Sequence, residues 1–317
     1  MVLSLVCTTK PDRSAIKFIP LLSFALDAPA LRLLRDEGFQ MLISVYMPTH
    51  NRGPLLERAI DSVLAQTHGD LELIIVDDGS SDGTWERLQE YMSRDPRVKA
   101  YRHDQPKGAC AARNLAISKA SGKFVTGLDD DDTFTPDRLE TLLNHYDEQY
   151  AFICSGYYWV AKNKTNRTMC SDKIITLAAQ LDANHATNQV FVERERMITI
   201  GGFDEALVAL QDYDCFTRLI KQYGPAFRVG QPLQHIYVDH GGARISNQKK
   251  SRRGFAQFLE KHGADMGFRQ KQNHAFWLKM RVHEPFSVGE FVTSIFAGHL
   301  KMKLGHLLKF GLKFGRT

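Results

Sequence analysis

The chain has 317 residues, of which 43% are hydrophobic and 24% are charged. A chain of this length and composition can bury a large core, which excludes a disordered or fibrous protein. The net charge is 41 − 36 = +5, and residues 301–317 alone hold five Lys or Arg and no acidic residue. The remaining residues are therefore balanced in charge, which argues against a nucleic-acid-binding surface over the body of the protein.

No stretch reaches 18 consecutive apolar residues, so the sequence predicts no membrane-spanning helix. The five cysteines are scattered and form no CxxC pair, which is typical of thiols in a reducing compartment. The apolar stretch 15–26 is interrupted by Lys17 and Pro20 and lacks the cleavage site of a secretory signal. We therefore expect residues 1–40 to be an N-terminal extension, or Met41 to be the functional start.

From Met41 onward, apolar runs alternate with helical patterns. Strands are predicted at 42–47, 71–76, 98–101 and 123–128, and helices at 54–66, 85–92 and 109–120. This alternation predicts an α/β fold with a mostly parallel central sheet flanked by crossover helices. Beyond residue 150 the pattern loosens, and we expect this half to cover the sheet edge and to shape a second binding site.

Three of the predicted strands end in polar clusters. The clusters are 48–52 (Pro-Thr-His-Asn-Arg), Asp77-Asp78 and 129–132, which is four consecutive aspartates. Because open parallel sheets bind ligands beyond the carboxyl ends of their strands, we expect these clusters to meet in one crevice. Adjacent carboxylates repel one another there, and Mg²⁺ or Mn²⁺ would relieve that repulsion. A solvated acidic turn before the helix that follows Pro136 is the simpler alternative.

The pattern Asp129-x-Asp131-x-Thr133 also matches the nucleophile motif of haloacid-dehalogenase-like phosphatases, in which the first Asp attacks a phosphoryl group. That family places this strand first in its domain and takes metal ligands from a later Gly-Asp pair, and this chain meets neither condition. Such a phosphatase is the alternative enzyme. A non-catalytic protein that binds nucleotide sugars or a membrane is the alternative from another class.

Short motifs follow one another in a characteristic order through residues 41–250. They are 44–52, 75–84, Gly108 with 112–114, 128–132 followed by Pro136 and Leu139, 201–205, and 212–214 with Arg218. The ordered set resembles family 2 glycosyltransferases. The resemblance implies an A-type, Rossmann-like glycosyltransferase fold, with a nucleotide-sugar-binding half at 41–140 and an acceptor-binding half at 141–250. It also implies an inverting enzyme that moves a sugar from a nucleotide-diphosphate donor in a single displacement.

The resemblance places several residues at the nucleotide. Asp78 matches the carboxylate that holds the nucleoside base or ribose, for which charge-assisted hydrogen bonds are suited. Pro48, Thr49 and Asn51 belong to the donor-binding loop, and the first two would approach the base mainly through backbone atoms. Arg113 would reach the nucleotide from its helix, although a surface ion pair is the simpler role for it.

The acidic run matches the DxD pattern of the family. We expect Asp131 to bind the Mn²⁺ or Mg²⁺ directly, with Asp129 or Asp130 on the donor ribose. Relatives commonly have a small residue in place of Asp130, so the division of roles stays open. His240 lies in a late segment over the donor and is expected to bind the metal or the diphosphate. The metal would neutralise charge that develops on the leaving nucleotide.

Asp212 matches the general base that deprotonates the acceptor hydroxyl. Such a base needs a pKa that partial burial and nearby acids raise towards the working pH. Relatives usually have Glu before this Asp, whereas this chain has Gln211, which removes one negative neighbour. Capping of a helix that begins near Tyr213 is the structural alternative for Asp212.

The segment 288–314 shows a separate pattern. On a helical projection one side carries Leu300, Leu304, Leu307, Leu308, Phe310 and Phe314, and the other carries His306, Lys309, Lys313 and Arg316. A basic amphipathic helix of this kind is typical of a segment that lies in an anionic membrane interface. A terminal helix packed on the domain or on another subunit would show the same pattern.

Taken together, the sequence predicts a metal-dependent inverting glycosyltransferase, peripheral on the cytoplasmic face of the membrane. A UDP-linked hexose or N-acetylhexosamine is the expected donor. A hydroxyl of a glycan or lipid-linked acceptor, in cell-surface polysaccharide or lipopolysaccharide synthesis, is the expected acceptor. Residues 251–317 are expected to form a helical region with the basic amphipathic tail.

Overall fold

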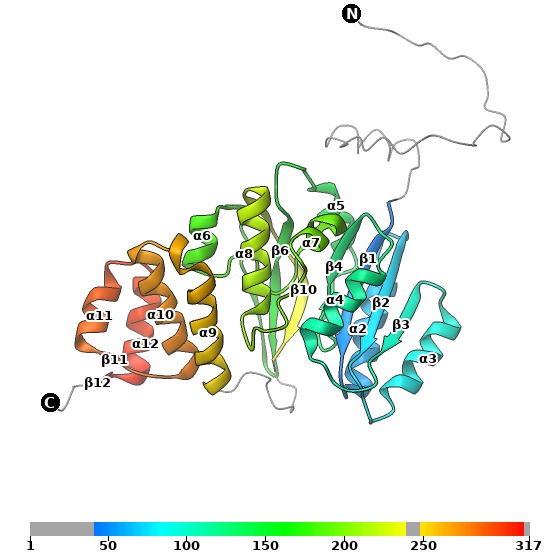
Figure 1. The fold of residues 1–317 in the computed structure, drawn as a ribbon, viewed down its shortest axis with the longest axis horizontal. Helices are drawn as coiled ribbons and strands as arrows, with labels where there is room; N and C mark the ends of the chain where they lie inside the picture. Colours follow the sequence, from blue (N-terminus) through cyan, green and yellow to red (C-terminus); the bar gives the residue numbers. More distant parts are fainter. Residues whose placement is uncertain (1–40, 239–247, 314–317) are drawn as a thin grey trace, which may run out of the picture.

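The computed structural model describes residues 41–238 and 248–313 (Figure 1). These residues form a ten-stranded sheet with helices on both faces, followed by a group of C-terminal helices. The predicted extension 1–40 and His240 lie outside the described residues.

The sheet is parallel in its first half and mixed in its second. Its strands are β1 (Ile43–Thr49), β2 (Leu71–Asp77), β3 (Val98–Arg102), β4 (Phe124–Gly127), β5 (Thr133–Phe134), β6 (Ile153–Ala161), β7 (Lys164–Thr168), β8 (Lys173–Ile175), β9 (Phe191–Glu193) and β10 (Ala226–Tyr237). They follow the order β3-β2-β1-β4-β9-β6-β10-β5, with β7 beside β6 and β8 beside β10. Because β9 is antiparallel to both β4 and β6, and β10 is parallel to β6, the strands β4, β6 and β10 end at the same edge.

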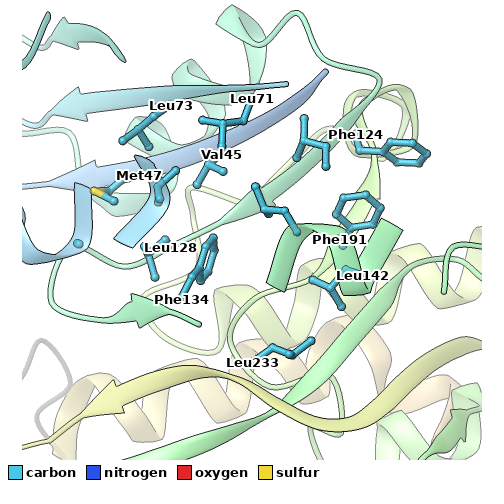
Figure 2. Packing of buried hydrophobic residues seen from close by; sticks show 14 of the residues in the cluster. Val45, Met47, Leu71, Leu73, Phe124, Leu128, Phe134, Leu142, Phe191 and Leu233 are labelled. Carbon is cyan, nitrogen blue, oxygen red and sulfur yellow. The ribbon is translucent and has the colours of Figure 1, made fainter. Parts of the chain in front are cut away.

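Two apolar clusters fill the two faces of the sheet. The helices beside it are α2 (Gly53–Leu64), α3 (Thr84–Arg94), α4 (Ala109–Lys119), α5 (Arg138–Asn144), α6 (Leu177–Asp182), α7 (Arg194–Thr199) and α8 (Gln211–Tyr223). Helices α2, α3 and α5 pack on one face, where Val45, Phe124 and Phe191 are buried (Figure 2). Helices α4, α7 and α8 pack on the other face. Strands β1 and β2 are buried along their whole length, as expected for strands covered on both sides.

The elements predicted between Met41 and residue 128 all occur, with ends within two residues of the predicted ones. Helix α4 shows why the pattern is readable, because its small apolar residues Ala112 and Ala116 are fully buried against β1 and β2. The C-terminal region consists of α9 (Gln248–His262), α10 (Phe268–Val282), α11 (Val288–Ile295) and α12 (Leu300–Phe310). It also contains a 3₁₀ turn (Gly263–Asp265) and the short strands β11 (Phe286–Ser287) and β12 (Leu312–Lys313). Figure 1 shows these helices beside α6 and α8, far from β1–β3.

The segment predicted as one continuous helix over 288–314 is two helices. Gly298 and His299 have φ angles of 89° and 55°, a conformation that a right-handed helix cannot contain. The polar side of α12 also faces inward, because Lys303 and His306 are buried. Lys303 Nζ donates to Asn273 Oδ1 at 2.7 Å, so the tail packs on the domain, as the alternative interpretation held. Within the described residues, every helix is too short or too polar to cross a bilayer.

Candidate functional site

The carboxyl ends of β2, β1 and β4 lie side by side at one edge of the sheet. In the β1–β2 ladder Thr49 pairs with Asp77, and in the β1–β4 ladder Tyr46 pairs with Gly127. The chain therefore leaves β2 at Asp78 and leaves β4 just before the acidic run, on opposite sides of the end of β1. Polar loops from three strands meet at this edge, where open parallel sheets bind ligands.

The loop after β1 is fixed to the loop after β2. Pro48 and Thr49 are the last two residues of β1 and are buried, and Thr49 O accepts from Asp78 N at 2.8 Å. Asn51 has a φ of 53° and its backbone N–H donates to Ser80 Oγ at 2.9 Å. These bonds hold the predicted donor-binding loop against Asp78.

Asp78 is held by three hydrogen bonds from the segment that precedes α4. Its Oδ1 accepts from Lys107 N at 2.8 Å and contacts His103 Nδ1 at 2.7 Å, and its Oδ2 accepts from Gly108 N at 2.7 Å. Burial alone would raise the pKa of Asp78, but these bonds lower it below its ordinary value. The neighbouring Asp77 is fully buried and accepts from a backbone N–H in the following turn at 2.9 Å. Asp78 is thus kept ionised, and Asp77 stabilises the turn.

Asp129 joins the two halves of the protein. Arg113 NH2 donates to Asp129 Oδ1 at 2.9 Å, and the arginine side chain is only 17% exposed, which is not a surface ion pair. Gln189 Nε2 lies 3.2 Å from the same oxygen, and Asn188 Nδ2 lies 3.2 Å from Oδ2. Asn188 and Gln189 escape prediction from sequence, because two polar residues before a short buried strand are a common pattern.

The other acids of the run have different environments. Arg52 Nε lies 3.3 Å from Asp130 Oδ1, and Arg52 NH2 lies 3.5 Å from Asp131 Oδ2. Burial, reinforced by the neighbouring carboxylates, raises the pKa of Asp130 to about 7. Asp132 turns inward and accepts from Tyr237 N at 3.0 Å, so it joins the acidic run to the end of β10.

The carboxylates of the acidic run 129–132 fit a divalent cation that takes only some of its ligands from the protein. Across residues 41–238 and 248–313, no three Asp, Glu, His or Cys side chains converge on one point. Mg²⁺ and Mn²⁺ accept one or two carboxylates and complete their shell with phosphate oxygens and water. Asp131, whose side chain is 22% exposed, and its buried neighbour Asp130 could supply those carboxylates. His240, the other predicted ligand, is not among the described residues.

Asp212, the predicted general base, lies in the first turn of α8. The helix starts directly after Leu210, whose φ is 63°. Withdrawal from water raises the pKa of Asp212, the backbone N–H of Tyr213 and the charge of Arg113 lower it, and the charge of Asp129 raises it. Asp212 is therefore within electrostatic reach of the Arg113–Asp129 pair.

The hydroxyl of Tyr46 is buried within electrostatic reach of Arg113, Asp129 and Asp212. The pKa of Tyr46 is raised by burial, and the charges of Arg113, Asp129 and Asp212 all act on it. Among the described residues the hydroxyl has no hydrogen-bond partner. A Cβ on Gly127 would collide with the tyrosine ring, so the glycine leaves room for it.

Residues 44–204 match the model of one protein family, described as glycosyl transferase family 2. The match covers about half of the chain and includes the polar ends of β1, β2 and β4. The chain belongs to glycosyltransferase family 2. This assignment decides against the phosphatase alternative for Asp129 and Asp131.

Relatives with curated descriptions agree with the family assignment. The putative colanic acid biosynthesis glycosyl transferase WcaA of Escherichia coli is 37% identical over 239 residues, which cover 70% of this glycosyltransferase and 81% of WcaA. The putative teichuronic acid biosynthesis glycosyltransferase TuaG of Bacillus subtilis is 40% identical over 129 residues, 40% of this chain and 51% of TuaG. The chain thus spans most of WcaA but about half of TuaG.

Solved structures share the fold of this glycosyltransferase. TarS 1–349 of S. aureus in complex with UDP-GlcNAc aligns with a TM-score of 0.59 at 18% identity, over 81% of this chain and 79% of TarS. The mannosyltransferase PcManGT of Pyrobaculum calidifontis, in complex with GDP-Man and Mn²⁺, aligns with a TM-score of 0.57 at 17% identity, over 89% and 83%. The fold is that of A-type glycosyltransferases, as the sequence resemblance implies.

The family motifs at the start of α4 and after α7 contact each other in the glycosyltransferase. Asn114 Oδ1 accepts from Phe203 N and Asn114 Nδ2 donates to Phe203 O, both at 2.8 Å. Gly202 has a φ of 65° and no space for a Cβ, because the Asn114 side chain lies against it. Arg218 of α8 donates to Gly202 O at 2.6 Å. This turn therefore ties α4 to α8, the helices that carry Arg113 and Asp212.

Proposed function

We propose that this glycosyltransferase moves a sugar from a UDP-sugar to a hydroxyl of a cell-surface glycan or of its lipid-linked precursor. The observation that carries the proposal is the meeting of Asp78, the acidic run and Arg113 at one sheet edge, with Asp212 within electrostatic reach. The names of WcaA and TuaG support a role in surface polysaccharide synthesis, and the UDP-GlcNAc complex of TarS supports a UDP-linked donor.

Residues 41–140 would bind the donor. Asp78, held ionised, would accept hydrogen bonds from the nucleoside, and Thr49 and Asn51 would line the nucleotide beside it. Asp129 would contact the ribose while Arg113 balances its charge. When bound, a divalent metal held by Asp131 would supply Lewis-acid stabilisation of the leaving diphosphate.

Residues 141–250 would bind the acceptor and supply the base. Asp212 would take the proton of the acceptor hydroxyl as the acceptor oxygen bonds to the anomeric carbon. The bond from that carbon to the diphosphate breaks in the same displacement, and the nucleotide leaves with the electron pair. A single displacement inverts the anomeric configuration. The raised pKa of Asp212 suits a base of this kind.

The outer surface of α12 would place the enzyme on the inner face of the cytoplasmic membrane. Leu300, Leu304 and Leu308 are 50%, 43% and 88% exposed, whereas Lys303 and His306 of the same helix are buried. Lys301 and Lys309 are exposed beside them. An exposed leucine row flanked by lysines is complementary to an anionic bilayer surface.

Calorimetric titration of the full chain with UDP, in Mn²⁺ and in EDTA, tests the donor and metal assignments. We expect Mn²⁺-dependent binding that Asp131→Asn weakens at least tenfold, whereas Glu86→Gln on the exposed surface of α3 leaves it unchanged. A panel of nucleotide sugars, scored for nucleotide release, then identifies the donor. Binding that is equally strong in EDTA would contradict the metal assignment, and failure of every nucleotide sugar to turn over would contradict the transferase assignment.

A further inference from the structure

Three basic side chains lie close together on segments of residues 141–250 that are outside the acidic run. In the antiparallel β8–β10 ladder Lys173 pairs directly with Arg228. Lys173 Nζ lies 3.1 Å from Nε2 of His185, which belongs to the loop after α6, and Arg228 NH1 donates to His185 O at 3.4 Å. Arg228 is only 5% exposed, while Lys173 and His185 are partly exposed. We call these three residues the basic cluster.

The basic cluster lacks a compensating charge. Like charges paired across two strands destabilise a sheet, and within the described residues no carboxylate forms an ion pair with any of the three. The long hydrogen bonds of Arg228 go to backbone carbonyls. Asp182 acts on the cluster from a distance, but its carboxylate already accepts from Arg269 and His299.

The local electrostatics reflect this excess of positive charge. Burial, and then the charges of Lys173 and Arg228, lower the pKa of His185 to about 4, against which Asp182 acts weakly and His299 adds a small further lowering. Burial and the charge of Arg228 also lower the pKa of Lys173. An oxyanion placed among these groups would remove the repulsion and give a buried guanidinium a charge-assisted partner.

The basic cluster lies beside the reaction site, in the half expected to bind the acceptor. The loop that carries His185 continues within three residues to Asn188, which contacts Asp129. Tyr157 of β6 lies within electrostatic reach of Arg228, and its ring is 6.3 Å from that of Trp159, which is 39% exposed. Residues two apart on a strand share a face, so the two rings form one aromatic surface on β6, the strand that pairs with the Arg228-bearing β10.

We propose that Arg228, Lys173 and His185 bind an anionic group of the acceptor, a carboxylate or a phosphate. The aromatic surface of Tyr157 and Trp159 would pack against the adjoining sugar ring. The proposal rests on the proposed function, since it names the chemical class of the acceptor. The anion would come either from an acidic sugar of the glycan or from the phosphate of a lipid-linked precursor.

Binding of small probes to the full chain tests the cluster without any turnover. The probes are glucuronate, its neutral counterpart glucose, and farnesyl diphosphate. Calorimetry and NMR of the labelled His185 imidazole measure their binding. We expect glucuronate or farnesyl diphosphate, but not glucose, to bind and to raise the pKa of His185 from about 4. Glucuronate binding alone identifies an acidic sugar as the source, and diphosphate binding alone identifies the lipid phosphate.

Substitutions then locate the binding. Lys173→Gln and His185→Gln change partly exposed residues and should weaken binding of the anionic probe about tenfold or more. Lys164→Gln, an exposed lysine of β7, is the matched control and should have no effect. The proposal would be overturned if Lys173→Gln and Lys164→Gln changed the affinity for the anionic probe equally, or if glucose bound as tightly as the anionic probe. Equal loss of UDP affinity in Lys173→Gln would overturn it too, because the cluster would then serve the donor.

Kinetics separate this proposal from the proposed function. With an anionic acceptor, Lys173→Gln should raise KM at nearly unchanged kcat and leave acceptor-independent hydrolysis of the donor unchanged. If the wild-type enzyme turns over no nucleotide sugar but still binds the anion through Lys173, the transferase assignment fails and the anion site stands. If transfer proceeds with an unchanged KM in Lys173→Gln, the anion site fails and the transferase assignment stands.

Discussion

At the scale of single residues, the carboxylates of the site differ in what surrounds them. Asp78 accepts hydrogen bonds from its own protein, and Asp129 is paired with Arg113. The hydrogen bonds to Asp78 lower its pKa and favour its ionised form, which suits a group that holds a ligand. Asp212 is instead withdrawn from water at a helix N-terminus, and its pKa is raised. Burial destabilises the ionised form of a carboxylate relative to the protonated form. The carboxylate is then a stronger base, which suits proton transfer.

Asp212→Asn should therefore lower kcat by about 10²–10⁴-fold, the usual contribution of a general base. The amide keeps the shape of the side chain, so affinity for UDP should stay within about twofold of wild type. Steady-state kinetics and calorimetric titration with UDP provide the two measurements. Asp265→Asn, at an exposed carboxylate paired with Lys221, serves as the control. Transfer at more than a tenth of the wild-type rate would disprove the assignment.

The pH dependence of wild-type activity follows from the raised pKa of Asp212. The base must be ionised to act, so activity is lost as the pH falls through the pKa of Asp212. Because that pKa is raised, kcat/KM should begin to fall at a higher pH than an ordinary carboxylate would give. An acidic limb at or below the ordinary carboxylate pKa would contradict the proposed environment of Asp212.

At the scale of elements, local pattern predicts the first half of the sheet well. Strands β1 and β2 are buried on both faces, so most of their residues are apolar, with Ser44 and Glu72 as buried exceptions that hydrogen-bond to each other. Helix α2 carries one apolar side at helical spacing. The prediction of one continuous helix in the C-terminal tail is wrong for an identifiable reason. Its apolar and basic residues fit a single long helix, but the chain reverses its φ at Gly298 and His299. The burial of Lys303 then depends on Asn273, which no local pattern reveals.

Gly202→Ala tests the turn that joins α4 to α8. The new methyl group would meet the Asn114 side chain at a φ of 65°, so we expect a loss of about 2–4 kcal/mol in the free energy of unfolding. Gly201→Ala is a matched control, because Gly201 has a φ of 78° but open space around its Cβ. It should cost only about 1 kcal/mol. Urea unfolding measures both, and equal losses would show that Asn114 does not restrict the turn.

At the scale of the whole molecule, the acidic sheet edge and the exposed leucines of α12 lie on separate parts of the chain. Figure 1 shows α12 at the end of the molecule remote from β1–β3. In the proposed function, α12 would hold the enzyme at the bilayer on which a lipid-linked acceptor is assembled. Substitutions in α12 should therefore change binding to the bilayer without changing the activity at the acidic sheet edge.

The double substitution Leu304→Ser/Leu308→Ser should lower binding to anionic vesicles at least tenfold, because two exposed leucines no longer enter the interface. Flotation with phosphatidylglycerol vesicles measures the bound fraction, and high salt should weaken wild-type binding. The control Leu259→Ser removes an exposed leucine of α9. Truncation of the tail is a poorer test, because it would remove the buried Lys303. Flotation of the double variant at the wild-type level would refute the membrane proposal.

The sequence by itself determined the family, the A-type fold and the candidate carboxylates, because strand periodicity and short motifs are local properties of the chain. The tertiary structure alone decided which partners those carboxylates meet. Asn188 reaches Asp129 across 59 positions, and Tyr237 reaches Asp132 across 105. The basic cluster around Arg228 likewise combines three separate segments. Such contacts arise from the packing of distant elements, and the free energy that fixes them is absent until the chain has folded.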